Sequence, residues 1–129
     1  GKKEVEVLAK GEQELEKDSC IIPFVLSDCI FIRNNDKMIK IFIHDLLYVE
    51  AERNYCKLHC KNKEHLLVST LKDLTEKLPS NLFLRIHRSF IVNISHIDEI
   101  ATSHVVIGKK AIPITADLKK ELLLHLQKV

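Results

Sequence analysis

Apolar residues recur at every second position along the middle of the chain, which is the spacing at which side chains share one face of a strand. The stretch MIKIFI, residues 38–43, places its three isoleucines on one face. The stretch YCKLHC, residues 55–60, places Cys56 and Cys60 together and turns His59 the other way. Both stretches are predicted to be half-buried strands, and most of the chain is predicted to form antiparallel sheet.

Short polar segments separate these stretches and predict turns between strands. Residues 34–36 read NND and residues 61–63 read KNK, and such residues favour turns. A glycine-first pair, Gly108 and Lys109, lies between VVI and KAIPI. This order fits a two-residue hairpin loop of type II′.

Two stretches show helical spacing in place of alternation. Thr70 and Asp73 form a T-x-x-D arrangement ahead of leucines at helical spacing, and Pro79 follows. This pattern predicts an N-terminal cap and a helix of about two turns. The last stretch of the chain, ADLKKELLLHLQKV, predicts a C-terminal helix. Its apolar positions are Leu118, Leu122, Leu126 and Val129.

The segment FLRIHRSFIVN, residues 83–93, carries the most informative irregularity. Its even-numbered positions are apolar except for Arg88, and an unpaired guanidinium is almost never tolerated in a core. We therefore expect the strand to break there. The break places His87, Arg88 and Ser89 in a turn between two strands, with the arginine projecting outward.

The length and composition fit one ordinary globular domain. The chain has 129 residues, of which 46% are hydrophobic and 29% charged, and about two-thirds of the unfolded surface is buried on folding at this size. Residues 1–18 are charged and are interpreted as a linker, and residues 19–129 are interpreted as the domain. No apolar stretch approaches the length of a membrane span and no signal peptide opens the sequence, so we expect a cytoplasmic location and no membrane partner.

The charge permits nucleic-acid binding without requiring it. The formal net charge is +2. Residues 1–18 hold six acids and four lysines, which leaves 16 bases and 12 acids in the rest of the chain. A weakly basic domain of this kind is compatible with nucleic-acid binding but does not identify it.

Neither a metal site nor catalysis is indicated by the remaining reactive residues. The four cysteines form no CxxC pair, and without a secretory signal we expect them to stay reduced. Cys56, His59, Cys60 and His65 have the right types for zinc, but strand alternation turns His59 away from the cysteines, which we interpret as small core residues. A redox role for Cys56 has no supporting motif. No phosphate loop, nucleophile elbow or HExxH is present, so we expect no enzyme, cofactor or metal.

Four ordered pieces of the sequence resemble the LytTR family of DNA-binding domains. They are LLYVEAERNYCKLHC, STLKDLTEKLP, FLRIHRSFIVNISHIDEI and a hairpin ending in AIPIT, and together they cover about residues 28 to 120. The resemblance implies a mostly β, elongated fold of small antiparallel sheets with about ten strands, one short internal helix and a C-terminal helix. It also implies sequence-specific double-stranded DNA binding by edge loops in the major groove.

The family's contacts, carried over position by position, fall in three segments. Arg88 takes a base-edge position, where a guanidinium can bind guanine O6 and N7. In the third segment many members carry an arginine after the Ser or Thr, but this sequence has Ala116 and Asp117, so only phosphate contacts are implied there. The implied DNA-binding residues are His87, Arg88 and Ser89; Arg53, Asn54, Tyr55 and Lys57; and Thr115, Lys119 and Lys120.

Two residues in the segment 83–93 each have two possible interpretations. His87 either contacts phosphate or holds the turn through its ring nitrogens. Arg85 is either a solvated strand residue or a DNA contact.

The resemblance further implies the effector domain of a bacterial two-component response regulator that controls transcription. Such domains bind direct or imperfect repeats as a pair or dimer and usually lie below a receiver domain that accepts a phosphoryl group, which would precede this sequence. The rival hypothesis is a β-rich protein-interaction module that pairs through exposed strand edges and does not bind DNA. It explains the sheet but not the turn arginine.

Overall fold

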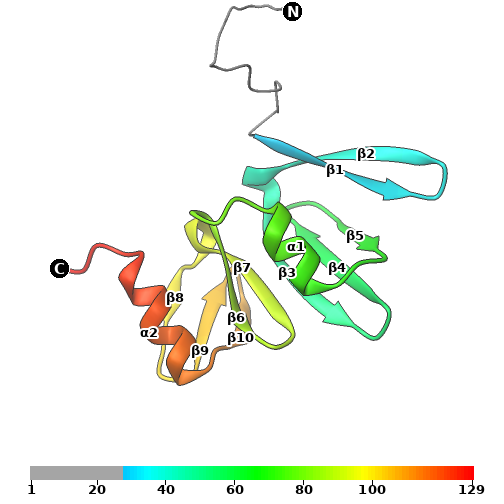
Figure 1. The fold of residues 1–129 in the computed structure, drawn as a ribbon. Helices are drawn as coiled ribbons and strands as arrows, with labels where there is room; N and C mark the ends of the chain where they lie inside the picture. The colour runs from blue at the N-terminus through cyan, green and yellow to red at the C-terminus, as the bar shows by residue number, and fades with distance from the viewer. Residues whose placement is uncertain (1–27) are drawn as a thin grey trace, which may run out of the picture.

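A computed structural model describes residues 28–129, so the predicted linker of residues 1–18 lies outside the described residues. The described part holds ten strands and two α-helices arranged as three antiparallel sheets (Figure 1). The mostly β fold of small sheets predicted from the sequence is therefore confirmed.

The first sheet is a hairpin of β1 (Cys29–Asn34) and β2 (Lys37–Phe42). Its turn falls at the predicted polar segment, where Asn35 has a φ of 59°, a value that asparagine tolerates better than most residues. The predicted MIKIFI strand ends one residue early. Ile43 is buried but begins a 3₁₀ turn, η1 (Ile43–Asp45), that leads into the next sheet.

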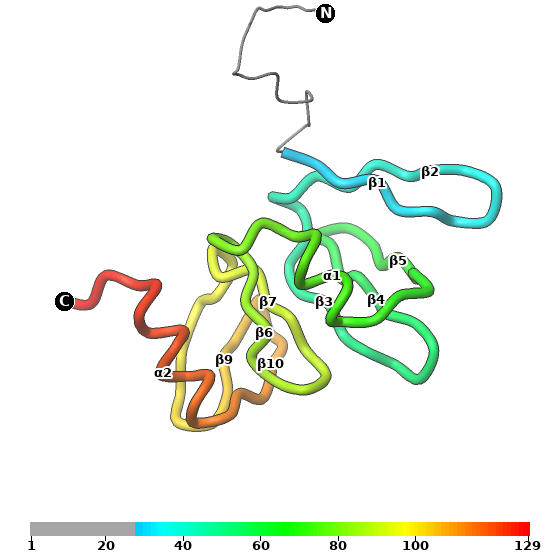
Figure 2. Tube along the Cα trace, viewed as in Figure 1, coloured from blue at the N-terminus to red at the C-terminus, as the bar shows by residue number. Residues whose placement is uncertain are grey.

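The second sheet has five strands in the order β5-β4-β3-β7-β6. The hairpin β3–β4 and the hairpin β6–β7 are joined in the middle by the antiparallel pair β3–β7. Figure 2 traces how the chain leaves β5, forms the helix α1 and returns to the sheet as β6. The strands are β3 (Leu46–Glu52), β4 (Tyr55–Cys60), β5 (Glu64–Leu67), β6 (Phe83–His87) and β7 (Phe90–Asn93).

The internal helix α1 (Leu71–Lys77) begins where the capping pattern predicts. The Thr70 hydroxyl accepts a hydrogen bond from the Asp73 backbone N–H at 3.1 Å, which satisfies one of the free amides of the first turn. The helix makes two turns and is followed by Leu78 and Pro79, as expected.

The third sheet and the second helix follow a 3₁₀ turn, η2 (Ile94–His96). The strands β8 (Glu99–Ile100), β9 (His104–Ile107) and β10 (Lys110–Pro113) lie in the order β10-β9-β8. Gly108 has a φ of 63° and Lys109 a negative φ, which fits the predicted type II′ loop. The helix α2 (Ala116–Leu124) ends before Leu126 and Val129, so the C-terminal helix predicted through these positions is too long.

The five-stranded sheet is covered on both faces, and each face forms one core. On one face the β1–β2 hairpin and α1 pack around Leu46, Leu58 and Ile91. On the other face the third sheet and α2 pack around Ile86 and Val92. Strand β7, which lies beside the central strand β3, is buried along its whole length, because both cores meet across it. Cys56 belongs to the first core, and Cys60 packs partly against it, as predicted for small apolar residues.

One polar side chain, Asn93, is completely buried between these cores. Its Nδ2 donates to the carbonyls of Ile43 at 3.3 Å and Leu46 at 2.9 Å. Its Oδ1 accepts from the backbone N–H and the hydroxyl of Ser95, at 3.0 and 2.6 Å. All of its hydrogen-bonding groups are used, which is the condition under which a buried amide is stable.

We predict that Asn93→Ala lowers the free energy of unfolding by about 1–3 kcal/mol, because it leaves buried carbonyl acceptors without a donor. Urea denaturation at pH 7 measures this loss. Asn62→Ala, in an exposed turn, is the control and should change stability by less than about 0.5 kcal/mol. Equal losses in the two variants would contradict the structural role of Asn93.

Candidate nucleic-acid interface

The strand pattern breaks at Arg88, as the sequence predicts. Strand β6 ends at His87 and β7 begins at Phe90, and the exposed Arg88 lies with Ser89 in the turn between them. His87 is thus the last strand residue and not the first turn residue.

A β-bulge explains how the arginine leaves the apolar face. The register between β6 and β7 shifts between Arg85 and His87, so Ile86 has no directly opposed partner. Ile86 remains fully buried in the core. The extra residue changes the direction of the chain that follows it, towards Arg88. Bulges have this effect on the side chains next to them.

Three hydrogen bonds hold the Arg88 turn. The Arg85 guanidinium Nη2 donates to the Arg88 carbonyl at 2.8 Å, and the Ser89 N–H donates to Nδ1 of His87 at 3.1 Å. The Ala51 N–H at the end of β3 donates to the Ser89 carbonyl at 2.8 Å. The His87 ring also packs against Phe90, with centroids 5.8 Å apart. His87 therefore makes the kind of local bond that one of its two interpretations describes, and Arg85 supports the turn.

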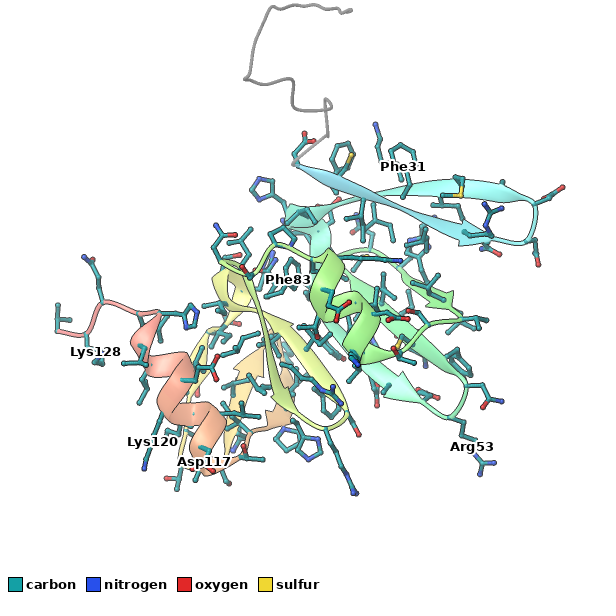
Figure 3. The ribbon with its side chains drawn as sticks, viewed as in Figure 1. Phe31, Arg53, Phe83, Asp117, Lys120 and Lys128 are labelled. Carbon is teal, nitrogen blue, oxygen red and sulfur yellow. The ribbon has the colours of Figure 1, made fainter. Side chains whose placement is uncertain are left out.

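The β3–β4 hairpin brings the second predicted segment next to this turn. Arg53 and Asn54 are exposed at its tip, and Figure 3 shows Arg53 pointing away from the sheet. Both the tip and the side chains of Arg85 and Arg88 line one open hollow of about 460 Å³. Residues 35 positions apart in sequence therefore share one surface.

Tyr55 and Lys57 are less available than the sequence suggests. The Tyr55 hydroxyl donates to Oε1 of Glu52 at 3.1 Å, a hydrogen bond that raises the pKa of this tyrosine. Lys57 Nζ lies 3.6 Å from Oε2 of Glu52 and 3.8 Å from Oε1 of Glu64, and these carboxylates raise the pKa of the lysine. Lys57 stays charged near neutral pH, but it already forms ion pairs with two carboxylates.

The third predicted segment begins at the end of β10. The Thr115 hydroxyl caps α2 by accepting from the Leu118 N–H at 3.3 Å, and the Thr115 N–H donates to the Ile86 carbonyl at 3.3 Å. This bond ties the segment to the bulge beside the Arg88 turn. Lys120 is exposed, whereas Lys119 is half-buried and its Nζ lies 3.4 Å from the Thr102 carbonyl.

The three segments lie along one edge of the molecule, at the bottom of Figure 1. The edge carries the β3–β4 tip, the β6–β7 turn and the start of α2, where Figure 3 labels Asp117 and Lys120. Sequence reasoning did not identify the bond from Arg85 to Arg88 or the competition of Glu52 for Tyr55 and Lys57. Residue spacing gives no signal for either, because both depend on how a turn or a strand pair closes.

His59 lies on the opposite sheet face from the two cysteines, as strand alternation predicts. Its Nε2 lies 3.1 Å from Oε1 of Glu50, and its Nδ1 lies 3.2 Å from Oε2 of Glu64. The ring stacks on Tyr48 with centroids 4.2 Å apart. This arrangement separates His59 from Cys56 and Cys60, so the three side chains do not converge on one metal position. It also gives Glu50 a local structural role as a partner of His59.

The comparisons with known proteins agree with the fold. The model of the LytTr DNA-binding domain family matches residues 36–127. An uncharacterised response regulatory protein of Vibrio cholerae is 42% identical over 64 residues, which are 46% of this chain and 24% of that protein. The sensory transduction protein LytT of Bacillus subtilis is 33% identical over 91 residues, 64% of this chain and 37% of that protein. The chain belongs to the LytTr DNA-binding domain family.

A solved structure supports the same fold. A LytTr DNA-binding domain from Bacillus cereus superposes with a TM-score of 0.64 at 24% identity, covering 74% of this chain and 96% of that one. The chain spans only about a quarter to two-fifths of the length of the full-length relatives it matches. Within residues 28–129, no helix is long and apolar enough to cross a membrane.

Cys60, at the end of β4 away from this edge, gives a test of the interpretation of the cysteines as core residues. Burial, and after it the nearby Asp45, raise the pKa of its thiol to about 11, and the thiolate is the reactive form. At pH 8 we predict that iodoacetamide alkylates Cys60 about 100-fold more slowly than in the urea-unfolded chain. Mass spectrometry of the digested chain follows the reaction, and the rate should rise with pH towards 11. Equal rates in folded and unfolded chains would contradict the prediction.

Proposed function

We propose that the chain binds double-stranded DNA sequence-specifically, with its three edge segments in the major groove. The observation that carries this proposal is the exposed Arg88 on a turn held by three hydrogen bonds, beside a second exposed arginine at the β3–β4 tip. A donor carried on backbone that is ordered before binding loses less conformational freedom on binding than one on a mobile loop. Family membership supports the same conclusion.

Arg88 is the residue proposed to read sequence. Its guanidinium can donate two parallel hydrogen bonds to O6 and N7 of guanine, a pattern that distinguishes guanine in the major groove. Arg53 and Asn54 have donors suitable for phosphate or a base edge. His87 and Ser89 act mainly by holding the turn, and Tyr55 and Lys57 contribute less because Glu52 engages them.

The third segment is proposed to contact the DNA backbone. Thr115, Lys119 and Lys120 are the candidates, and they position the domain without reading bases. The residues after Thr115 are Ala116 and the acidic Asp117, in the first turn of α2. We therefore propose fewer base contacts than many family members make, and a larger share of recognition through DNA shape.

In the full-length protein we propose that this domain is the effector of a cytoplasmic response regulator that controls transcription. The relatives include a protein named transcriptional regulatory protein YpdB in Escherichia coli, 30% identical over 74 residues. Binding of two copies to direct or imperfect repeats, an upstream receiver domain and the absence of enzymatic activity belong to this proposal. Neither the family nor the relatives support a protein-interaction module that does not bind DNA.

We predict that Arg88→Ala weakens binding to the selected DNA site by roughly 1–3 kcal/mol and relaxes preference at one base pair. The site is first obtained by selection from a random DNA pool, and fluorescence anisotropy then compares cognate and scrambled duplexes. Lys120→Ala, also exposed, is the matched control and should weaken both duplexes alike and reduce the salt dependence. If Arg88→Ala binds cognate DNA as tightly as the unchanged chain, Arg88 does not read a base.

A second prediction concerns the support of the turn. Arg85→Lys keeps the positive charge but removes the planar guanidinium that reaches the Arg88 carbonyl. We expect it to reduce the ratio of cognate to scrambled affinity several-fold while binding to scrambled DNA stays within about twofold. An equal loss on both duplexes would instead make Arg85 a phosphate contact.

A further inference from the structure

The two faces of the five-stranded sheet carry charges of opposite sign near the β3–β4 tip. Arg85 pairs with Ile91, which belongs to the first core, so Arg85 lies on the face that α1 covers. Glu50 pairs with Phe90, which belongs to the second core. Glu52 follows two residues later and lies on the same face as Glu50, because side chains alternate along a strand.

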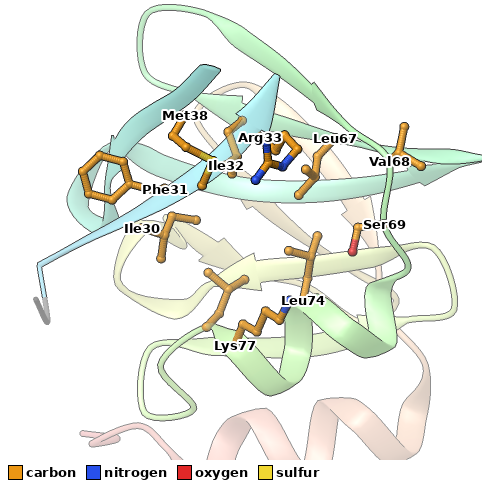
Figure 4. A pocket seen from close by; sticks show the side chains of 11 residues that line it. Ile30, Phe31, Ile32, Arg33, Met38, Leu67, Val68, Ser69, Leu74 and Lys77 are labelled. Carbon is orange, nitrogen blue, oxygen red and sulfur yellow. The ribbon is translucent and has the colours of Figure 1, made fainter. Parts of the chain in front are cut away.

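Basic side chains on the α1 side line two adjoining hollows. The first is the open hollow beside the β3–β4 tip, which Arg85 lines. The second lies between β1 and α1 and shares Val68 and Ser69 with the first (Figure 4). Among the described residues that line the second hollow, the charged ones are Arg33 and Lys77. Within residues 28–129, this side of the sheet therefore offers positive charge to a polyanion.

On the opposite face, Lys57 lies among three carboxylates. Its Nζ is 3.6 Å from Oε2 of Glu52 and 3.8 Å from Oε1 of Glu64. The other oxygen of Glu64 is 3.2 Å from Nδ1 of His59, and Nε2 of that ring is 3.1 Å from Oε1 of Glu50. The charge of the lysine is thus balanced within the sheet face.

Glu52 is the member of this group that lies at the candidate DNA edge. It directly precedes the two tip residues, and it lines the same hollow as Arg88. Within residues 28–129, no other acidic residue lines that hollow. Its Oε1 accepts from the Tyr55 hydroxyl at 3.1 Å, so both carboxylate oxygens have a partner. Its charge raises the pKa of Lys57 more than the charge of Glu64 does.

We infer that Glu52 is a specificity-determining residue, which holds Lys57 and so suppresses contacts of this lysine with DNA phosphates of any sequence. The inference rests on the proposed DNA binding. A free ammonium at this position would bind phosphate without regard to sequence and would raise the affinity for all DNA. The base contact proposed for Arg88 does not involve this lysine. Specificity is a difference between affinities for two partners, so restraining a sequence-independent contact increases it.

Fluorescence anisotropy on the chain of residues 1–129, with the cognate and scrambled duplexes, tests the inference. Glu52→Gln removes the charge but keeps a carbonyl oxygen that can accept from Tyr55. We expect the affinity for the scrambled duplex to rise about 3- to 10-fold, and the dependence of log affinity on log salt to steepen by about 0.9, the value for one added phosphate contact. The affinity for the cognate duplex should rise less, because base contacts fix the position of the domain there. The ratio of the two affinities should therefore fall.

Glu64→Gln is the matched control. It also removes a negative charge beside Lys57, but Glu64 lies on β5, outside the residues that line the hollow. Its effect on either duplex should stay within about twofold. A double-mutant cycle tests the route of the effect: Lys57→Ala should lower the affinity for the scrambled duplex several-fold more in the Glu52→Gln chain than in the unchanged chain. Circular dichroism verifies that each variant is folded.

Three results would overturn the inference while leaving the proposed function intact. They are a Glu52→Gln chain whose ratio of cognate to scrambled affinity does not fall, equal gains in Glu52→Gln and Glu64→Gln, and a cycle without coupling to Lys57. Equal gains would mean that net charge alone sets the affinity. If the unchanged chain binds neither duplex, the proposed function fails and the inference fails with it.

Discussion

The pairing of β3 with β7 is the constraint on which the rest of the structure depends. It joins two hairpins through the pairs Tyr48–Val92, Val49–Ile91 and Glu50–Phe90. At one end the buried Asn93 binds the carbonyls that lead into β3, and at the other end Ala51 binds the carbonyl of the Arg88 turn. A single set of hydrogen bonds therefore fixes the register of the sheet and the distance between two exposed loops.

Burial on both faces of β7 makes this constraint rigid. The sheet lies between two separate cores, so a shift of one residue would move an apolar set from one core into the other and leave Asn93 without its partners. The bulge at Ile86 occurs next to this clamped region, where the chain can add a residue without disturbing β7. The same bulge carbonyl receives the N–H of Thr115. The positions of all three edge segments are therefore set by one central strand pair.

Local patterns predicted most of the fold because they report contacts that are close in sequence. Period-two alternation identified the strand at residues 55–60, the T-x-x-D arrangement identified α1, and the break at Arg88 identified the turn between β6 and β7. The end of α2 before Leu126 was not predictable, because helical spacing continues past the point where the helix stops. Within the site, sequence located the exposed arginines. It did not locate the Arg85 bond or the pairing of Lys57 with two acids, because these depend on side chains brought together by turn closure and strand register.

The division of charge along the edge has a consequence for recognition. Two lysines at this edge are partly engaged, Lys57 by Glu52 and Glu64 and Lys119 by the Thr102 carbonyl, whereas Lys120 is exposed. Arg53 and Arg88 have exposed side chains, and the backbone beneath Arg88 is held by the fold. Under the proposed function, we expect such an edge to draw less of its affinity from diffuse attraction to phosphate, which is strongly salt-dependent. We expect it to draw more from the guanidinium groups of Arg53 and Arg88, because a guanidinium can discriminate between bases. A domain with a net charge near zero can in this way be selective without being strongly basic.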